Sequence, residues 1–299
     1  MTHLPAPSLD RPMLGIAFML GFCLMAPLGD GMAKALAGTF PILMLVFVRT
    51  TTQTVLLAPL VARNLASLHL SSRLWRLTLL RACLHILGIW AMFASLTYLP
   101  LADAIAIAFV MPFILLLLGH FVLGEEVGPH RMGACAVGFM GTLMVIQPSF
   151  ANVGWPAMLP LVVAVVFALF MLVTRQISKE IDPITLQAIN GAQASVIVGA
   201  AVLITGAQGT WPIPQGADIL WLFALGALGT LGHLCMTWSL RLAPASTLAP
   251  MQYLEIPVAT VIGFAAFGDL PNGLAAVGIC VTVLTGLYII LRENKGRSA

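Results

Sequence analysis

Two ionisable side chains lie deep inside stretches of sequence that are apolar enough to cross a membrane. Arg49 is nine residues into the stretch 40–60, and Glu255 is ten residues into the stretch 245–267. At a rise of 1.5 Å per residue, both lie about 13–15 Å from the start of their helices, which is about half of a ~30 Å hydrocarbon core. An ionised group at this depth costs about 2.5–3.5 kcal/mol on insertion scales, so it indicates either a function or a partner.

Two interpretations of these charges are open. In the first, Arg49 binds an anionic group of a substrate, while Glu255 contacts the substrate or takes up a proton whose movement is coupled to transport. In the second, the two side chains form a static ion pair that only fixes helix packing. Because the opposite charges lie at the same depth, a pair between Arg49 and Glu255 is expected to be within reach.

A second pair of charges, Asp30 and Lys34, has the i, i+4 spacing of a helical ion pair with the acid first. Pro27 and Gly29 come just before it and predict a kinked or broken helix, which would expose backbone groups toward a cavity. We therefore consider Asp30 and Lys34 candidates for coupling or gating. In the alternative interpretation, Lys34 reaches the membrane interface and Asp30 is only its partner.

Other candidates are polar or aromatic side chains within apolar stretches. His85 corresponds to His233, which lies 148 positions later, and His85 is a candidate for coupling or gating. A cavity with aromatic walls and polar tips would suit a flat ring. The further candidate substrate-binding residues are Trp90, Trp238, Tyr253, Gln252 and Asn190. For each of them, ordinary helix packing is the alternative.

The elements that must position these side chains are ten apolar stretches. Hydrophobic residues make up 60% of the 299 residues and charged residues only 8%, whereas soluble domains carry about 25% charged residues. A membrane helix needs about 20 mostly apolar residues. The ten predicted spans are 13–36, 40–60, 77–98, 101–123, 132–147, 155–177, 183–205, 219–241, 245–267 and 273–291.

The distribution of Lys and Arg predicts the orientation of these spans. Apart from Lys34 and Arg49, all of them lie in, or at the edge of, alternate gaps. We count Arg81, just inside the third stretch, and Arg175, near the end of the sixth, among these loop cations. The positive-inside rule then makes both termini cytoplasmic. The pattern predicts a multi-pass protein of the cell inner membrane, in which the net charge of +3 reflects topology and not nucleic-acid binding.

The two halves of the sequence repeat each other. Pro100 matches Pro244, and Gly124 matches Gly268, each 144 positions later. Because five spans are an odd number, the second copy must enter the membrane from the opposite side. We therefore predict an all-α membrane protein with ten transmembrane helices in two inverted five-helix repeats, a form typical of secondary transporters. The predicted order is a tail (1–12), a first repeat (13–148), a second repeat (155–291) and a second tail (292–299).

The second part of each repeat resembles a known family. The residues that carry this resemblance are Pro112-Phe-Ile-Leu, Gly124, Glu125, Gly133 and Gly141, and in the second copy Glu255-Ile-Pro257, Gly268, Asp269, Gly278 and Gly286. They resemble the EamA-type repeat of the drug/metabolite transporter superfamily, although Asp269 replaces the usual glutamate and Pro257 lies one residue later than Pro112 does. The resemblance covers about 15–291 and implies a central cavity lined by both repeats. The family includes amino-acid exporters, nucleotide-sugar carriers and uptake systems for riboflavin or S-adenosylmethionine.

These observations predict a secondary transporter that moves a small metabolite, such as an amino acid, riboflavin or an S-adenosylmethionine-like solute, by alternating access. We expect a monomer or homodimer, with proton coupling as an open alternative and with no cofactor or metal. The direction is open, so export of drugs or toxic metabolites is a second hypothesis. A channel or a membrane-embedded enzyme is disfavoured, because the sequence has no repeated filter loop, no HExxH motif and no P-loop.

Overall fold

The computed structural model describes residues 11–125, 127–145, 154–268 and 273–295, and every regular element in these ranges is helical. The longer helices are α1 (Pro12–Leu36), α2 (Ile42–Ala62), α3 (Ser72–Leu96), α5 (Met111–Leu123), α6 (Pro129–Val145), α8 (Leu159–Ile177), α9 (Pro183–Thr205), α10 (Ala217–Leu242), α12 (Glu255–Phe267) and α13 (Gly273–Lys295). The shorter elements are α4 (Leu101–Ala108), α11 (Ala245–Leu248) and the 3₁₀ turns Leu65–Leu68, Trp155–Met158, Ala207–Thr210 and Ala249–Leu254.

Within these ranges, eight segments are long and apolar enough to cross a membrane. They are α1, α2, α3, Leu101–Leu123, α8, α9, α10 and Ala245–Phe267. The other two predicted spans, 132–147 and 273–291, coincide with α6 and α13, whose apolar segments Met132–Gly141 and Ala276–Thr285 are shorter. The chain is therefore an all-helical, multi-pass membrane protein with eight candidate spans in its described residues.

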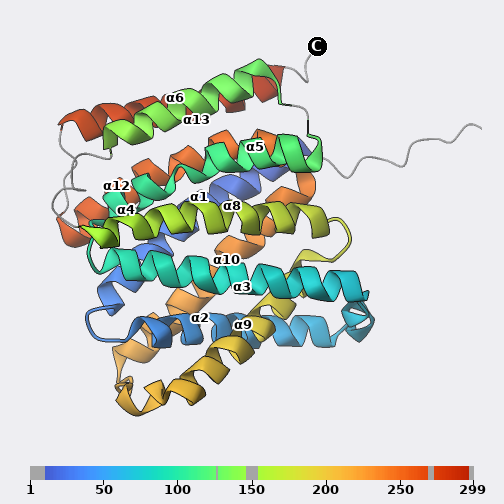
Figure 1. Ribbon diagram of the computed structural model, residues 1–299, viewed down its shortest axis with the longest axis vertical. Helices are drawn as coiled ribbons and strands as arrows, with labels where there is room; N and C mark the ends of the chain where they lie inside the picture. The colour runs from blue at the N-terminus through green and yellow to red at the C-terminus, as the bar shows by residue number, and fades with distance from the viewer. Residues whose placement is uncertain (1–10, 126, 146–153, 269–272, 296–299) are drawn as a thin grey trace, which may run out of the picture.

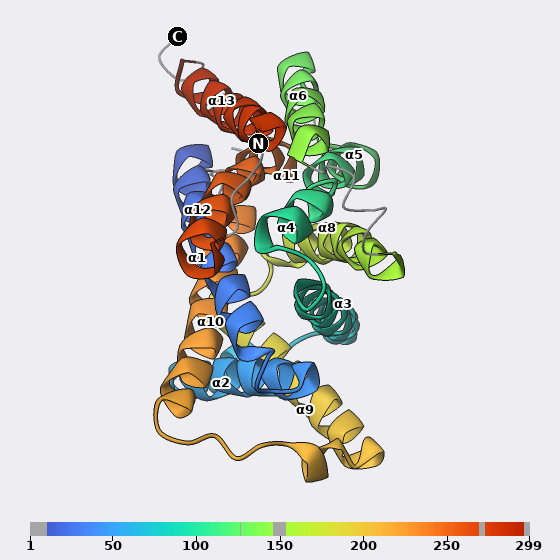
Figure 2. The same ribbon diagram turned by 90° about the vertical axis from the view of Figure 1, so that its left-hand side faces the viewer.

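The helices pack in pairs that join distant parts of the chain. Helix α1 packs along α10, α3 along α8, α2 along α9, and α6 along α13. Figures 1 and 2 show α6 and α13 at one edge of the molecule and α2 with α9 at the other. The large apolar core between these edges takes residues from both halves of the sequence, including Met19, Leu45, Phe93, Phe170 and Met236.

Two of the eight spans are interrupted, and neither is the one predicted to break. The segment 101–123 is interrupted at Phe109–Val110, just before Pro112, and the segment 245–267 contains a 3₁₀ turn over Ala249–Leu254. Proline has no backbone N–H and cannot continue the hydrogen-bond pattern of a preceding turn. Helix α1, by contrast, runs without interruption through Pro27. The prediction of a broken first helix was wrong, and the breaks lie in α4–α5 and α11–α12.

The matched glycines of the two halves have the same backbone role. Gly124 follows α5 with a φ of 64°, and Gly268 follows α12 with a φ of 73°. Both adopt the left-handed conformation that ends a helix at low cost only when the residue is glycine. Their spacing in the sequence therefore reflects two equivalent helix ends. Asp269, the next residue after Gly268, lies outside the described residues.

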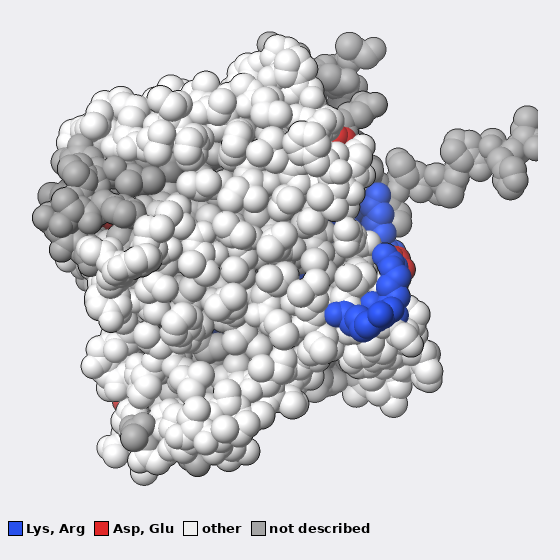
Figure 3. All heavy atoms as spheres, in the orientation of Figure 1, with Lys and Arg blue, Asp and Glu red and all other residues white. Residues whose placement is uncertain are grey.

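Cationic side chains gather at one end of the helices, which we call the cationic end (Figure 3). Exposed Arg63, Arg73, Arg76 and Lys179 lie there, and Arg73 forms an ion pair of 2.8 Å with Glu180. Arg81 does not belong to this surface: it is the tenth residue of α3 and fully buried. Its assignment to the loop cations was therefore wrong.

Candidate substrate cavity

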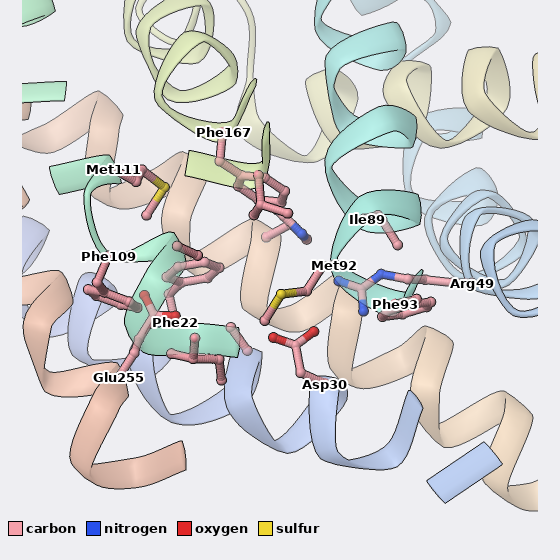
Figure 4. Close-up of a pocket in the computed structure, with 15 residues that line it drawn as sticks. Phe22, Asp30, Arg49, Ile89, Met92, Phe93, Phe109, Met111, Phe167 and Glu255 are labelled. Carbon is pink, nitrogen blue, oxygen red and sulfur yellow. The ribbon is translucent and has the colours of Figure 1, made fainter. Parts of the chain in front are cut away.

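A cavity with an empty volume of about 600 Å³ lies between the two halves of the chain. Its walls come from α1, α2, α3, α4, α5, α8, α10 and α12, and both interrupted segments contribute at their breaks. The apolar lining includes Phe22, Ile89, Met92, Phe93, Phe109, Met111 and Phe167. The polar lining is Asp30, Arg49, His233 and Glu255 (Figure 4). Apolar and aromatic walls with a few convergent polar groups are typical of sites for small organic ligands.

Arg49 enters the cavity from the middle of α2 and is held in place by its neighbours. Its guanidinium lies against the backbone of α10, where a Cβ atom added to Gly229 would stand 2.7 Å from Arg49 Cζ. On another side, the guanidinium carbon lies 5.8 Å from the centre of the Phe93 ring, within cation–π range. Its Nε is buried and has no hydrogen-bond partner among the described residues. Arg49 is thus a fixed cation with unused donor capacity.

Glu255 enters the cavity from the opposite half of the chain, as the first residue of α12. The preceding 3₁₀ turn brings this carboxylate to the cavity wall. The thiol of Cys23 on α1 donates to Glu255 Oε1 over 3.9 Å. Arg49 and Glu255 share the cavity, but the described residues show no ion pair between them. The direct ion pair, which was one of the two interpretations left open by the sequence, is therefore absent in this conformation.

The sequence suggested Glu255 as the acidic partner of Arg49, but in the structure Asp30 is the carboxylate that interacts electrostatically with Arg49. It lies between Arg49 and Glu255 in Figure 4 and is within electrostatic reach of both. Lys34, one turn further along α1, has other surroundings: its Nζ donates to Leu99 O over 3.4 Å and lies 4.8 Å from the centre of the Phe267 ring. Asp30 therefore lines the cavity, whereas Lys34 contacts the loop before α4 and the end of α12.

His85 lies behind the cavity wall in a chain of polar side chains. Its Nε2 is 3.1 Å from Nε2 of His233, and its Nδ1 is 2.8 Å from Asn190 Nδ2. His233 lines the cavity, while His85 and Asn190 are fully buried and do not. The two histidines that correspond in the two halves of the sequence thus lie within direct hydrogen-bond distance of each other. The amide of Asn190 holds this pair from behind and does not contact the cavity.

Four other predicted residues lie outside the cavity lining. Tyr253 is fully buried, and its hydroxyl donates to Cys135 O on α6 over 3.2 Å. Gln252 donates to the sulfur of Met171 over 3.4 Å. Trp90 is 42% exposed on the outer face of α3, and Trp238 stacks on Phe18 with 6.1 Å between ring centres. The contacts of Tyr253, Gln252 and Trp238 match the alternative that the sequence left open, which is helix packing, whereas Trp90 lies on the surface of the molecule.

The model of the EamA-like transporter family matches residues 13–147 and 154–292, which is most of the chain. The chain belongs to the EamA-like transporter family. Like its relatives, it is a small-metabolite transporter of the drug/metabolite type and not an enzyme.

Relatives of this EamA-like transporter include two named by their cargo. A riboflavin transporter of Rhizobium johnstonii is 30% identical over 221 residues, covering 74% of this chain and 72% of the relative. An S-adenosylmethionine uptake transporter of Rickettsia felis is 25% identical over 292 residues, covering 97% of each chain. A solved crystal structure matches with a TM-score of 0.70 at 18% identity, covering 95% of this chain and 97% of the other. That likeness shows the fold alone.

Several lining residues of this EamA-like transporter were not among the predicted site residues. Phe22 and Ala26 precede Asp30 at intervals of four residues, so they share its helix face and could have been predicted from helical periodicity. Met92 and Phe93 lie about two turns beyond His85 in the same way. Phe109 and Met111 gave no such signal, because they lie at the break between α4 and α5, where a regular period does not apply.

Proposed function

We propose that this transporter carries a small zwitterionic metabolite with an aromatic ring, and that the cavity between its halves is the substrate site. The observation that carries the proposal is the composition of the lining, which combines one guanidinium and two carboxylates with phenylalanine and methionine side chains. Arg49 would bind an anionic group, and Asp30 and Glu255 would bind cationic groups. The rings of Phe22, Phe93, Phe109 and Phe167 supply flat apolar surface for a ring of the cargo.

The balance of charge favours an S-adenosylmethionine-like cargo. With one guanidinium and two carboxylates, and with the His233 imidazole already paired with His85, the cavity matches a solute that has more positive than negative groups. S-adenosylmethionine has one carboxylate, an ammonium group, a sulfonium group and an adenine ring. The relatives named S-adenosylmethionine uptake transporters, which match nearly the whole chain, support this assignment.

Riboflavin is the second candidate cargo. The relative named a riboflavin transporter is 30% identical, and the four phenylalanine rings suit a flat tricyclic ring system. Riboflavin carries no charge at neutral pH, however, so it would leave Arg49 and the two carboxylates without charged partners. An exporter of aromatic drugs with cationic groups would use the same lining residues but would move its cargo in the opposite direction.

The proposed mechanism is alternating access by two inverted five-helix repeats. The packing supports this symmetry, because shifting each span by five positions turns the α1–α10 contact into the α8–α3 contact and leaves α2–α9 and α6–α13 unchanged. In this proposal α6 and α13 are the fifth and tenth spans. The cationic end then faces the cytoplasm, with both termini on that side of the inner membrane.

Glu255 is the proposed site of proton coupling. Its carboxylate is buried among mostly apolar lining residues, where the neutral acid is tolerated better than an unpaired anion. The other ionisable groups of the cavity lining are Asp30, Arg49 and His233, and Cys23 contacts the Glu255 carboxylate. If Glu255 takes up a proton when the cargo leaves, Glu255→Gln should abolish uptake driven by a pH gradient and keep exchange of bound cargo.

A thermal-shift screen of the purified protein tests the proposed cargo. We expect S-adenosylmethionine at 100 times its Kd to stabilise the fold by about 2.7 kcal/mol and so to raise the Tm. In Arg49→Gln this shift should disappear, whereas Arg76→Gln, an exposed arginine of α3, should keep it. A rise in Tm with riboflavin but not with S-adenosylmethionine would identify riboflavin as the better candidate cargo. If neither compound raised the Tm of the wild-type protein, the cargo assignment would be wrong.

A further inference from the structure

Arg81 is a buried cation that the proposed site does not use. Its side chain is fully buried in the middle of α3. Its Nε donates to Thr174 Oγ1 on α8 over 2.7 Å, and one terminal nitrogen donates to Thr237 Oγ1 on α10 over 3.3 Å. The guanidinium carbon also lies 4.3 Å from the centre of the Phe170 ring. Three helices therefore fix Arg81 in one position.

These contacts do not neutralise the charge of Arg81. Among the described residues no carboxylate lies within ion-pair distance, and the second terminal nitrogen, Nη1, is buried without any hydrogen-bond partner. Arg49, by comparison, shares its cavity with Asp30 and Glu255. A buried cation without an anion is costly inside a membrane, which indicates that an anion reaches it during function.

Helix α10 places the two buried arginines on one line. The guanidinium of Arg49 lies against Gly229, and that of Arg81 contacts Thr237, about two turns further toward the cationic end. At a rise of 1.5 Å per residue the two contact points are about 12 Å apart. His233 lies midway between them on the same helix and pairs with His85. Going from the cavity toward the cationic end, the order is therefore Arg49, the histidine pair and Arg81.

We propose that Arg81 is the second binding station for the anionic group of the cargo, a carboxylate in the case proposed here. In the conformation described here, Arg49 holds this group in the cavity. When α3, α8 and α10 separate toward the cationic end, Arg81 takes over the carboxylate with its unused Nη1 donor. Until these helices separate, Thr174 and Thr237 hold the guanidinium in its observed orientation. The inference rests on the proposed function, because it needs a cargo that binds at Arg49.

The test compares binding and counterflow for two labelled compounds, S-adenosylmethionine and its decarboxylated analogue, in proteoliposomes. For Arg81→Gln we expect S-adenosylmethionine binding within about twofold of wild type and counterflow at least tenfold slower. With the decarboxylated analogue, Arg81→Gln and wild type should exchange at equal rates, because no carboxylate is transferred. Arg81→Lys should recover part of the S-adenosylmethionine counterflow, and Arg76→Gln on the same helix should behave as wild type.

Three results would overturn the inference. Wild-type counterflow of S-adenosylmethionine in Arg81→Gln would show that the residue is not needed. Equal losses for both compounds, with a lower Tm, would assign Arg81 to helix packing. If the wild-type protein carried neither compound, the inference would fall together with the proposed cargo, and this result is distinct from the other two.

Discussion

At the scale of single residues, the position of Arg49 depends on the absence of a side chain on its neighbour. Gly229 allows the guanidinium to lie against the backbone of α10, with distances from an added Cβ of 2.7 Å to Cζ and 2.8 Å to Nε. Contacts this short do not occur between real atoms, so any larger residue must displace the guanidinium. Because the displaced atoms are the flexible end of a side chain, the fold itself can adapt.

Gly229→Ala should therefore reduce cargo binding more than stability. We expect the Kd of S-adenosylmethionine to rise about tenfold, equivalent to a loss of about 1.4 kcal/mol, with almost no change in the Tm of the cargo-free protein. Equilibrium binding and thermal unfolding of the same preparations measure the two effects.

A second glycine provides the control for this substitution. Gly21 lies on α1, where an added Cβ would meet Cys235 Sγ at 3.5 Å, an ordinary contact distance. Gly21→Ala should leave both the Kd and the Tm unchanged. Unaltered binding in Gly229→Ala would show that the observed position of Arg49 is not needed for binding.

The sequence allowed some of these residues to be predicted, for a physical reason. Arg49, Asp30 and Glu255 stand out because charge is rare and costly inside apolar stretches, and all three line the cavity. The residues that contact them were harder to predict, because contacts between helices depend on how each helix is rotated about its axis, which one sequence does not define. For this reason the packing of Arg49 on Gly229 could not be predicted, and the role of Tyr253 in holding α6 could not either.

At the scale of elements, a contact at the cationic end joins three segments, and we infer that it holds this end closed. The Glu125 carboxylate, at the end of α5, accepts from Arg175 Nε over 3.1 Å and from the backbone N–H groups of Ala245 and Ser246 over 3.2 and 3.0 Å. Arg175 also donates to Leu240 O over 2.7 Å. This contact ties α5 and α8 to the junction of α10 and α11.

Glu125→Gln should weaken the contact with Arg175 and so allow the cationic end to open more often. Both members of the ion pair are about one-tenth exposed, and removing one partner of a buried pair costs about 3 kcal/mol. We expect a lower Tm and faster labelling of a buried cysteine introduced by Thr247→Cys in α11, in a background in which the five native cysteines have been replaced. The rate of reaction with a maleimide measures this opening.

The exposed pair of Arg73 and Glu180 is the matched control. Its side chains are 56% and 44% exposed, and surface ion pairs contribute only about 0–1 kcal/mol. Glu180→Gln should therefore change neither the Tm nor the labelling rate. Equal labelling in Glu125→Gln and Glu180→Gln would argue against a role of Glu125 in closing this end.

The extent of most elements could be predicted, but their interruptions could not. The span 183–205 coincides with α9, where Asp182 accepts hydrogen bonds from the first turn and Gly206 ends the helix. Capping residues of this kind allow the ends of a helix to be predicted from the sequence. The break in the segment 101–123 lies just before Pro112, whereas α1 runs through Pro27 without a break, so a proline alone does not show where a helix is interrupted.

At the scale of the whole molecule, the proposed inverted arrangement requires that all cationic loops lie on one side of the membrane. A reporter that is active only in the cytoplasm should be active when it is fused at Arg63, after α2, and when it is fused at Lys179, after α8. The physical reason is that Arg and Lys in short loops resist translocation. A fusion at Gly206, after α9, should report the opposite side and serves as the control. Reporters at Arg63 and Lys179 on different sides would contradict the inverted arrangement.

The central claim is that the cavity lined by Arg49, Asp30 and Glu255 binds the cargo and faces each side in turn. Counterflow in proteoliposomes tests it most directly, because only a carrier exchanges labelled for unlabelled cargo across a sealed membrane. We predict transient accumulation of labelled S-adenosylmethionine with the wild-type protein, at least a tenfold loss in Arg49→Gln, and wild-type rates in Arg76→Gln. Equal counterflow in Arg49→Gln and wild type would contradict the claim.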